Sequence, residues 1–185
     1  MKWSLPRSLN IGGKDWGINA DYRDILTIIS ELNKLEEDDQ VRVYVSLALF
    51  YVDFEHMPEL DYHEAAEKLM WFISCGEAES GIEKKLPKTI DWEQDYQLIV
   101  TDINKVAGYD VRGAQFCHWW TFVALFYSIG EGPLSTVVAI REKLRKGKKL
   151  EKWEREYYNQ NRSKIDFKQH YTESENEIIK KWLGR

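Results

Sequence analysis

The sequence predicts a mainly α-helical protein, a multi-helix bundle with a small N-terminal β-hairpin. Only four prolines and eleven glycines occur in 185 residues, so long stretches lack a helix-breaking residue, which favours helices over a many-turned β fold. Apolar side chains recur every three or four residues along most of the chain, as on the buried face of a helix. The aromatic-rich segment 114–129 carries this pattern most densely, and we expect the other helices to pack around it.

The N-terminal region is the one stretch with a convincing β pattern. Segments 8–11 and 15–19 flank the pair Gly12-Gly13, and glycines accept the positive φ angles of a tight hairpin turn. Lys14 follows the two glycines, but the spacing of a phosphate-binding loop is absent. We therefore expect a plain hairpin here.

Two helices are expected after the hairpin. Asp21 is a suitable N-cap for a helix over 22–34. The acidic run 36–39 separates that helix from a second one over 41–53. The alternating start of the second segment, Val41-Arg-Val-Tyr-Val45, also fits a strand, but its apolar pattern continues past ten residues and favours a helix.

A third helix is expected to end near Ser74. Asp61 and Glu64 have the spacing of a capping box at its start, and Gly76 suits a left-handed cap at its end. The polar stretch 77–89 follows, and we expect it to be the most mobile loop of the core.

The central segment 114–129 comes after a helix expected between Asp91 and Gly108. It is apolar nearly all round, so other parts of the chain must cover most of its sides. It contains Gln, His, Thr and Ser and is too short and too polar for a membrane span. Pro133 suits the first turn of the next helix.

The last part of the chain is basic, and we expect two domains. Residues 1–145 would form the hairpin and helical core, and residues 146–185 a basic, partly extended C-terminal helical segment. Thr172 and Glu175 have capping-box spacing before a short amphipathic helix. The apolar residues of that helix are Ile178, Ile179, Trp182 and Leu183.

Charge is unevenly distributed along the chain. Residues 1–110 hold 11 Lys and Arg against 22 Asp and Glu, a balance of −11. Residues 111–185 hold 15 against 9, a balance of +6, which gives the overall −5. The two parts can attract each other within one chain or between copies, or form an ordinary solvated surface.

No constellation of residues indicates an enzyme, a cofactor site or a metal site. None of the four histidines has a ligand-spaced partner, and no hydrolase, metalloprotease or nucleotide-binding pattern is present. Cys117 and His118 are adjacent, and neighbours on a helix point about 100° apart. We expect His118 in the core or an interface, bonded to a neighbouring helix, and Cys75 and Cys117 as buried thiols.

Two parts of the chain are candidates for binding a partner: the basic stretch 141–155 and the C-terminal helix. The basic stretch could contact nucleic acid through phosphates and stacking, or an acidic protein surface. The acidic balance of the whole chain favours a protein partner, and the C-terminal helix would dock on a neighbouring copy or on its own core. The residues expected to bind are Arg141, Arg145, Lys148, Lys149, Trp153, Ile178, Ile179, Trp182 and Leu183.

Three stretches carry a resemblance to a known family. They are Leu5-Pro-x-Ser-Leu-x-Ile-Gly-Gly-Lys14 with Trp16-x-Ile-x-x-Asp-Tyr-Arg23, then Trp71-Phe-Ile-x-Cys-Gly76, and then Asp110-x-Arg112 leading to His118-Trp-Trp120. Their order and spacing resemble the bacteriophage gene-product-fifteen family of tailed phages and prophages of Gram-positive bacteria. The resemblance spans roughly residues 5–160.

The resemblance implies a tail assembly chaperone, because members of that family are encoded among the tail morphogenesis genes. Such a protein binds the tape measure protein, assists tail tube assembly and is typically absent from the finished particle. Other tail proteins and further copies of the chain are the other expected partners. The N-terminus has no apolar signal core, so we expect the host bacterial cytoplasm and no membrane. The alternatives are a minor structural tail protein and, less favoured, a nucleic-acid-binding protein.

Overall fold

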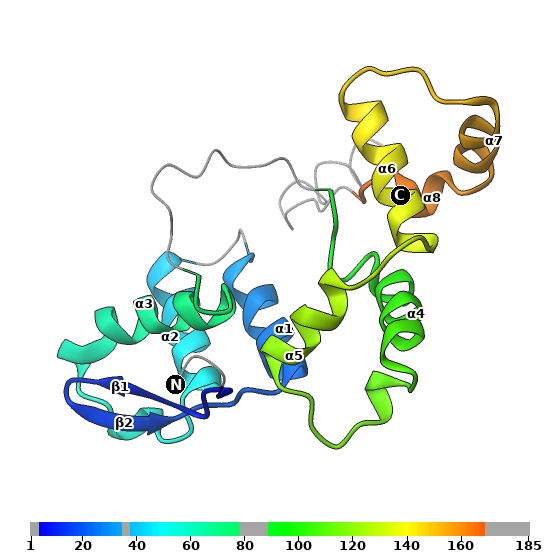
Figure 1. Ribbon diagram of the computed structural model, residues 1–185. Coiled ribbons are helices and arrows are strands. Elements are labelled where there is room, and N and C mark those ends of the chain that lie inside the picture. Colours follow the sequence, from blue (N-terminus) through cyan, green and yellow to red (C-terminus); the bar gives the residue numbers. More distant parts are fainter. Residues whose placement is uncertain (1–3, 35–37, 78–88, 169–185) are drawn as a thin grey trace, which may run out of the picture. The chain divides into compact units, whose positions relative to one another are not determined.

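The computed structural model describes residues 4–34, 38–77 and 89–168. Helices make up most of this part of the chain, and a two-stranded hairpin lies near the N-terminus (Figure 1). The expected mainly α fold with an N-terminal hairpin is confirmed. The chain forms two compact units. Unit 1 consists of Met1–Leu86 and Tyr109–Ser128, and unit 2 of Pro87–Gly108 and Ile129–Arg185.

The hairpin has the turn that its glycines predict. Strands β1 (Ser8–Ile11) and β2 (Lys14–Gly17) pair antiparallel. Gly12 and Gly13 both have positive φ, 57° and 82°, as in the tight turns that match strand twist. One face of the hairpin packs against the rest of unit 1. The buried side chains of that face are Leu9, Ile11 and Trp16.

Three helices follow the hairpin in unit 1: α1 (Tyr22–Leu32), α2 (Asp39–Phe50) and α3 (Tyr62–Ile73). Asp21 caps α1 as predicted, since its carboxylate accepts the amide of the second helical residue. Asp38 caps α2 in the same way. The second segment is a helix and not a strand, which confirms the choice made from the length of its apolar pattern.

The core of unit 1 lies between these helices. Phe50 of α2 and Phe72 of α3 are fully buried, with their ring centroids 5.2 Å apart. Tyr51 is also buried, and its hydroxyl donates to the carbonyl of Ala65 at 2.9 Å, so its polar end is satisfied. The remaining large buried side chains of this core include Ile11, Ile25, Ile28, Leu47, Leu69, Val111 and Phe122.

The start of α3 differs from the prediction, and its end agrees with it. The capping box of Asp61 and Glu64 is wrong, because the side chain of Asp61 makes no capping bond. Glu64 instead accepts the amide of Gly12 at 3.0 Å, which ties α3 to the hairpin turn. The helix ends in the left-handed conformation that was expected, with a φ of 80° at Gly76, but this conformation begins one residue earlier, at Cys75 with a φ of 58°. The predicted mobile loop lies mainly at 78–88, outside the described residues.

The predicted central helix is shorter than expected. Helix α5 is Trp119–Tyr127, and the residues from 114 to its start are not helical. They run alongside the chain that leads into α1. The amide of Trp119, the first residue of α5, donates to the carbonyl of Ala20 at 2.8 Å. The amide of Tyr22 donates to the carbonyl of Cys117 at 2.9 Å. A helical start at 114 is therefore wrong, since these backbone groups bond to a distant segment.

Helix α5 is also less enclosed than its sequence suggests. Trp119 and Phe122 are buried, and the ring of Phe122 stacks on Tyr22 at 4.3 Å. Tyr127, by contrast, is 82% exposed. The helix thus contributes one buried face to the core of unit 1.

Unit 2 contains α4 (Tyr96–Ala107), α6 (Pro133–Arg145), α7 (Lys152–Gln160) and the short α8 (Arg162–Ile165). Pro133 is the first residue of α6, as predicted. A small apolar core joins α6 to α8, with partly buried side chains from α4, the α6–α7 connection and α7 around it. Its residues are Val137, Ile140 and Ile165, with Leu98, Leu150, Tyr157 and Tyr158 packed against them.

Helix α4 begins later than expected. Asp91 does not start the helix but accepts the amides of Glu93 and Gln94 at 3.0 and 2.8 Å, which stabilises the turn before it. The helix proper starts at Tyr96. Its end is as predicted, at Gly108 in the left-handed conformation with φ 76°.

The expected domains, 1–145 and 146–185, do not coincide with units 1 and 2. Val137 and Ile140, before that boundary, share a core with Leu150 and Ile165 after it. Groups of contacting residues do not measure which parts of a chain fold alone. The expected domain boundary therefore stays a prediction.

Candidate partner-binding surfaces

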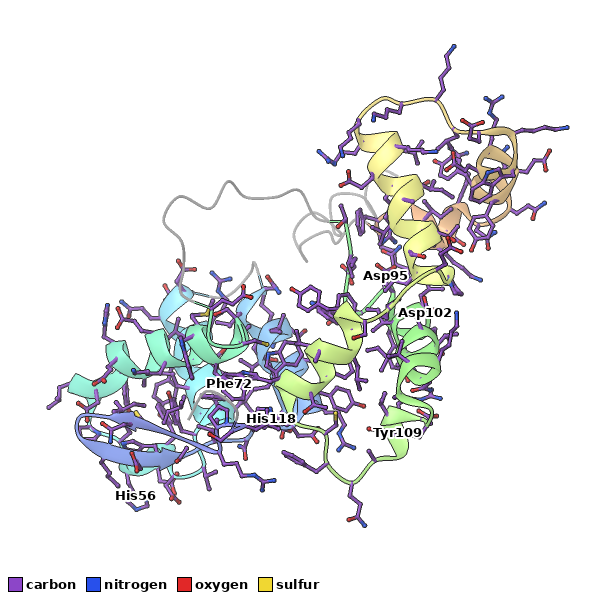
Figure 2. The ribbon with its side chains drawn as sticks, in the orientation of Figure 1. His56, Phe72, Asp95, Asp102, Tyr109 and His118 are labelled. Atoms are coloured by element: carbon purple, nitrogen blue, oxygen red, sulfur yellow. The ribbon has the colours of Figure 1, made fainter. Side chains whose placement is uncertain are left out.

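The three sequence motifs meet in unit 1, around His118. Its Nε2 lies 2.9 Å from the carbonyl oxygen of Pro6, which joins the third motif to the first. The indole N–H of Trp120 donates to the carbonyl of Phe72 at 2.9 Å, which joins the third motif to the second. The rings of Phe72 and His118 are 5.5 Å apart, edge to face, and Figure 2 shows the two side chains together.

Asp21 makes a second link between the first and third motifs. Its carboxylate accepts the amide of Cys117 at 2.9 Å and the guanidinium of Arg23 at 2.7 Å. Arg23 also donates to the carbonyl of Gln115 at 3.1 Å. Burial acts to raise the pKa of Asp21, but these hydrogen bonds outweigh it and hold that pKa below its ordinary value. The pair fixes the segment before α5 against the start of α1.

His118 caps α5 and is not poised for catalysis. Its Nδ1 accepts the amide of Trp120 at 3.1 Å, so Nε2 carries the proton and donates to Pro6. Burial lowers the pKa of His118, which favours this neutral form. Burial also raises the pKa of the neighbouring thiol, Cys117, so no thiolate is favoured there. The expected core histidine is confirmed, although its partner, Pro6, does not lie in a helix.

The third motif also holds the end of α3. The indole of Trp119 donates to the carbonyl of Ile73 at 2.9 Å. A Cβ on Gly76 would lie 3.2 Å from the rings of both Trp71 and Trp120, so a side chain there would crowd the two indoles. Because its polar atoms bond within unit 1, we interpret the junction of the three motifs as structural.

Neither a metal centre nor a membrane helix is found in the part of the chain that the structure describes. Within residues 4–34, 38–77 and 89–168, no group of three or more His, Cys, Asp or Glu side chains could hold a metal ion. No helix in those ranges is long and apolar enough to cross a membrane.

An apolar groove lies along α2 of unit 1, with a volume of about 600 Å³. Leu47 lines it and is fully buried, while Val41 and Tyr44 are 50% and 54% exposed. Monomeric proteins seldom expose contiguous apolar surface without a function. We call this feature the α2 groove. Its lining residues are Asp39, Gln40, Val41, Val43, Tyr44, Leu47 and Tyr62.

One acidic side chain, Asp39, lines the α2 groove. Asp38 and Asp39 are exposed at the start of α2. Asp39 forms an ion pair with Arg42. Burial, and then the charges of Tyr44 and Glu59, raise the pKa of Tyr62, which also lines the groove. An occupant with apolar side chains flanked by basic ones would match this surface.

Arg141, the first residue of the predicted basic surface, is inside unit 2. It is 6% exposed and forms a two-pronged ion pair with Asp95, at 2.6 and 2.9 Å. Its guanidinium also donates to the carbonyls of Thr89, Lys164 and Ile165. Arg141 thus ties α4 to α6 and α8 and cannot present its charge to a partner, which corrects that part of the prediction.

Three further basic residues of this stretch pair with carboxylates of the same unit. Lys143 bonds to Glu154 at 2.6 and 2.8 Å, and this bond lowers the pKa of that carboxyl group. Arg145 and Lys146 both pair with Glu142, at 3.1 and 2.5 Å. Glu142 and Glu154 therefore neutralise part of the positive charge of this stretch locally.

The other predicted residues of the basic stretch lie together on the surface. Lys148 and Lys149 are exposed in the connection between α6 and α7, and Trp153 is 57% exposed in the first turn of α7. Whether they bind a partner stays a prediction. The predicted C-terminal contacts lie outside the described residues. They are Ile178, Ile179, Trp182 and Leu183.

Sequence reasoning missed two buried carboxylates, one just before α4 and one within it, and it missed the α2 groove. Asp95 and Asp102, both labelled in Figure 2, are almost fully buried, and an acidic residue inside a polar-looking helix gives no sign of its partner. The groove did leave a signal. The alternation from Val41 to Val45 places apolar side chains on two faces of one helix, and only one face can be buried in the core.

Comparison with known proteins assigns the family. The family model described as bacteriophage Gp15 protein matches residues 1–167 of this chain. No curated protein and no solved structure matches the chain. The family is not known to be enzymatic. Because the match covers nearly the whole chain, including all three motifs, the protein belongs to the bacteriophage Gp15 protein family.

Proposed function

We propose that the protein is a non-enzymatic tail assembly chaperone, which binds the tape measure protein in the host bacterial cytoplasm and assists tail tube assembly. The observation that carries this proposal is the family match over residues 1–167. The role follows from the tail morphogenesis genes among which that family is encoded. The α2 groove supplies a surface of the kind that such a role requires.

The α2 groove suits an amphipathic helix as its occupant. Such helices bind by placing an apolar face in a hydrophobic groove. The tape measure protein is long and helical, so it offers apolar faces that need cover until the tail tube surrounds them. Val41 and Tyr44 would contact the apolar face of that helix, and Asp38 and Asp39 would lie near basic side chains beside it.

Co-expression with the tape measure protein of the same phage tests the proposal. We expect the tape measure protein to stay soluble and to elute with this chain on size exclusion. An insoluble tape measure protein with no complex contradicts the chaperone role. Expression of each protein alone is the control, because a tape measure protein that is soluble by itself needs no chaperone.

A minor structural tail protein is the alternative, since the family match fits it equally well. Mass spectrometry of purified virions separates the two roles. A chaperone should be absent or far below one copy per tail ring, whereas a structural component should be present in fixed ratio to another tail protein.

Binding of nucleic acid through residues 141–155 is less favoured than the sequence suggested. Arg141 is paired inside unit 2, and Lys143, Arg145 and Lys146 have carboxylate partners. Few phosphate contacts would remain, and affinity for DNA depends on their number. A binding assay at low salt that shows no shift of DNA would exclude this role.

A further inference from the structure

The segment 164–168 of unit 2 is held by side chains that bond to its backbone. The side-chain amide of Gln94 donates to the carbonyls of Lys164 and Asp166, at 3.2 and 2.8 Å. Its oxygen accepts the backbone amide of Lys168 at 2.9 Å. Almost every residue of a peptide carries these backbone groups, so Gln94 recognises a peptide chain in a given path and not a particular side chain.

Arg141 makes further bonds of the same kind. Its Nε and Nη2 donate to the carbonyls of Ile165 and Lys164, at 2.6 and 2.9 Å. The same guanidinium is also fixed by groups outside the segment, since it pairs with Asp95 and donates to the carbonyl of Thr89 at 3.1 Å. These bonds would keep Arg141 in place if the segment left.

Two side chains of the segment add specificity to these backbone contacts. Ile165 is 1% exposed and packs in the small apolar core on α6, against which α8 lies in Figure 1. The ring of Phe167 lies 4.1 Å from the guanidinium of Arg141, and a cation is attracted to the face of such a ring. Asp166 between them is extended, with φ −68° and ψ 134°. Main-chain bonds combined with pockets for alternate side chains are a common mode of recognising linear peptides.

We propose that the turn before α4 and one face of α6 form a binding site for a linear peptide of a partner protein, which the chain's own segment 164–168 fills until that peptide replaces it. The peptide has an aliphatic residue and, two positions later, an aromatic one, as Ile165 and Phe167 are spaced. The site lies in unit 2 and recognises a backbone. It is therefore separate from the α2 groove and does not depend on the proposed client.

The tether of the segment determines when the site is open. A short connection gives a bound segment an effective concentration on the order of millimolar, so a free peptide with equal contacts fills the site only near that concentration. A peptide that binds more tightly, or a chain whose own segment has lost an anchor, shifts this balance. The wild-type protein should therefore bind a matching free peptide weakly.

Binding of a labelled peptide to the full chain tests the proposal. The probe is fluorescein-labelled Ser-Lys-Ile-Asp-Phe-Lys, the sequence of residues 163–168, and the readout is fluorescence anisotropy. Phe167→Ala removes the 36% exposed anchor of the chain's own segment and should bind the probe at least tenfold more tightly than the wild-type chain. Tyr127→Ala, which removes an aromatic side chain exposed on α5, is the matched control and should bind it as the wild type does.

Two changes should abolish the gain in affinity. Adding Gln94→Leu to Phe167→Ala removes the bonds to the backbone of the probe, and a probe with alanine in place of its isoleucine and phenylalanine lacks both anchors. No gain for Phe167→Ala over the wild type overturns the proposal. A gain that survives Gln94→Leu, or that the alanine probe reproduces, overturns it as well.

Hydrogen exchange of Phe167→Ala locates the bound probe. Saturating probe should speed the exchange of the amides in 164–168, because the displaced segment loses bonds such as that of Lys168 to Gln94. The amides of α2 should be unchanged. Probe that leaves 164–168 protected, or that protects α2 instead, binds elsewhere and contradicts the assigned site. The tape measure protein is absent from this experiment, so its outcome is independent of the chaperone role.

Discussion

Single side chains that bond to the backbone of distant segments explain the three family motifs. His118 bonds to Pro6, Trp119 to Ile73 and Trp120 to Phe72. Each of these bonds joins residues far apart in the sequence and satisfies a polar group in a largely apolar setting. The motifs therefore mark positions at which the fold of unit 1 depends on one residue type.

Trp119 should contribute more to stability than any exposed aromatic residue. Its indole is buried and bonded to Ile73, so Trp119→Ala should lower the free energy of unfolding by about 3–5 kcal/mol. Urea denaturation followed by circular dichroism measures this. Tyr127→Ala is the control and should change it by less than about 0.5 kcal/mol. Equal effects of the two substitutions would contradict the assigned burial.

The buried ion pair of Arg141 and Asp95 should be needed as a pair. Arg141→Met leaves the carboxylate of Asp95 buried without its cation and should cost about 3–5 kcal/mol of stability. The double variant Arg141→Met/Asp95→Leu should recover much of this loss, because no charge remains buried. Lys148→Met is the exposed control and should be neutral. A mild effect of Arg141→Met in thermal unfolding would place this guanidinium on the surface.

Stability should fall as His118 becomes protonated. Its pKa in the folded protein lies below the ordinary value of 6.5, so the unfolded chain binds the proton more readily. The stabilisation is fully present above pH 6.5 and is lost as the pH falls from there toward the folded pKa. His118→Asn keeps an acceptor for the helix cap and should remove this slope. Unfolding measured at pH 5.5 and 7.5 on both proteins tests it, and identical slopes would contradict it.

At the scale of elements, sequence patterns identified most helices but misplaced some of their starts. The hairpin, the caps at Asp21 and Gly108 and the start of α6 at Pro133 follow from local chemistry, and these were predicted. The start of α5 depends on backbone bonds to the segment before α1, which no local pattern reveals.

Elements were also joined by contacts that local patterns cannot give. Glu64 caps no helix but bonds to the hairpin turn at Gly12. Arg141 stands in a run of basic residues, yet it binds Asp95 in the turn before α4. For the same reason, the sequence did not reveal that Arg141 of the basic stretch is buried. Burial of a charged residue depends on a partner far away in the sequence.

The start of α6 should require a glycine. A Cβ on Gly132 would lie 2.3 Å from the carboxylate of Asp102, which accepts the amide of Leu134 at 2.9 Å. Gly132→Ala should therefore displace this buried carboxylate and cost about 1–3 kcal/mol, as overpacking does. Gly130→Ala is the matched control, because its Cβ would meet nothing within 4 Å. Thermal unfolding of the two variants should differ clearly.

At the scale of the whole molecule, the α2 groove is the surface on which the proposed function depends. A client helix in the groove would cover its apolar lining until the tail tube surrounds the client, which opposes aggregation.

Co-purification of the tape measure protein with single-residue variants tests the central claim, that the α2 groove binds this client. The account predicts that Val41→Glu, with normal folding by circular dichroism, loses the tape measure protein. Tyr127→Glu, an exposed change on α5, should retain it at the wild-type ratio. Tape measure protein bound equally by both variants would contradict the assignment of the groove.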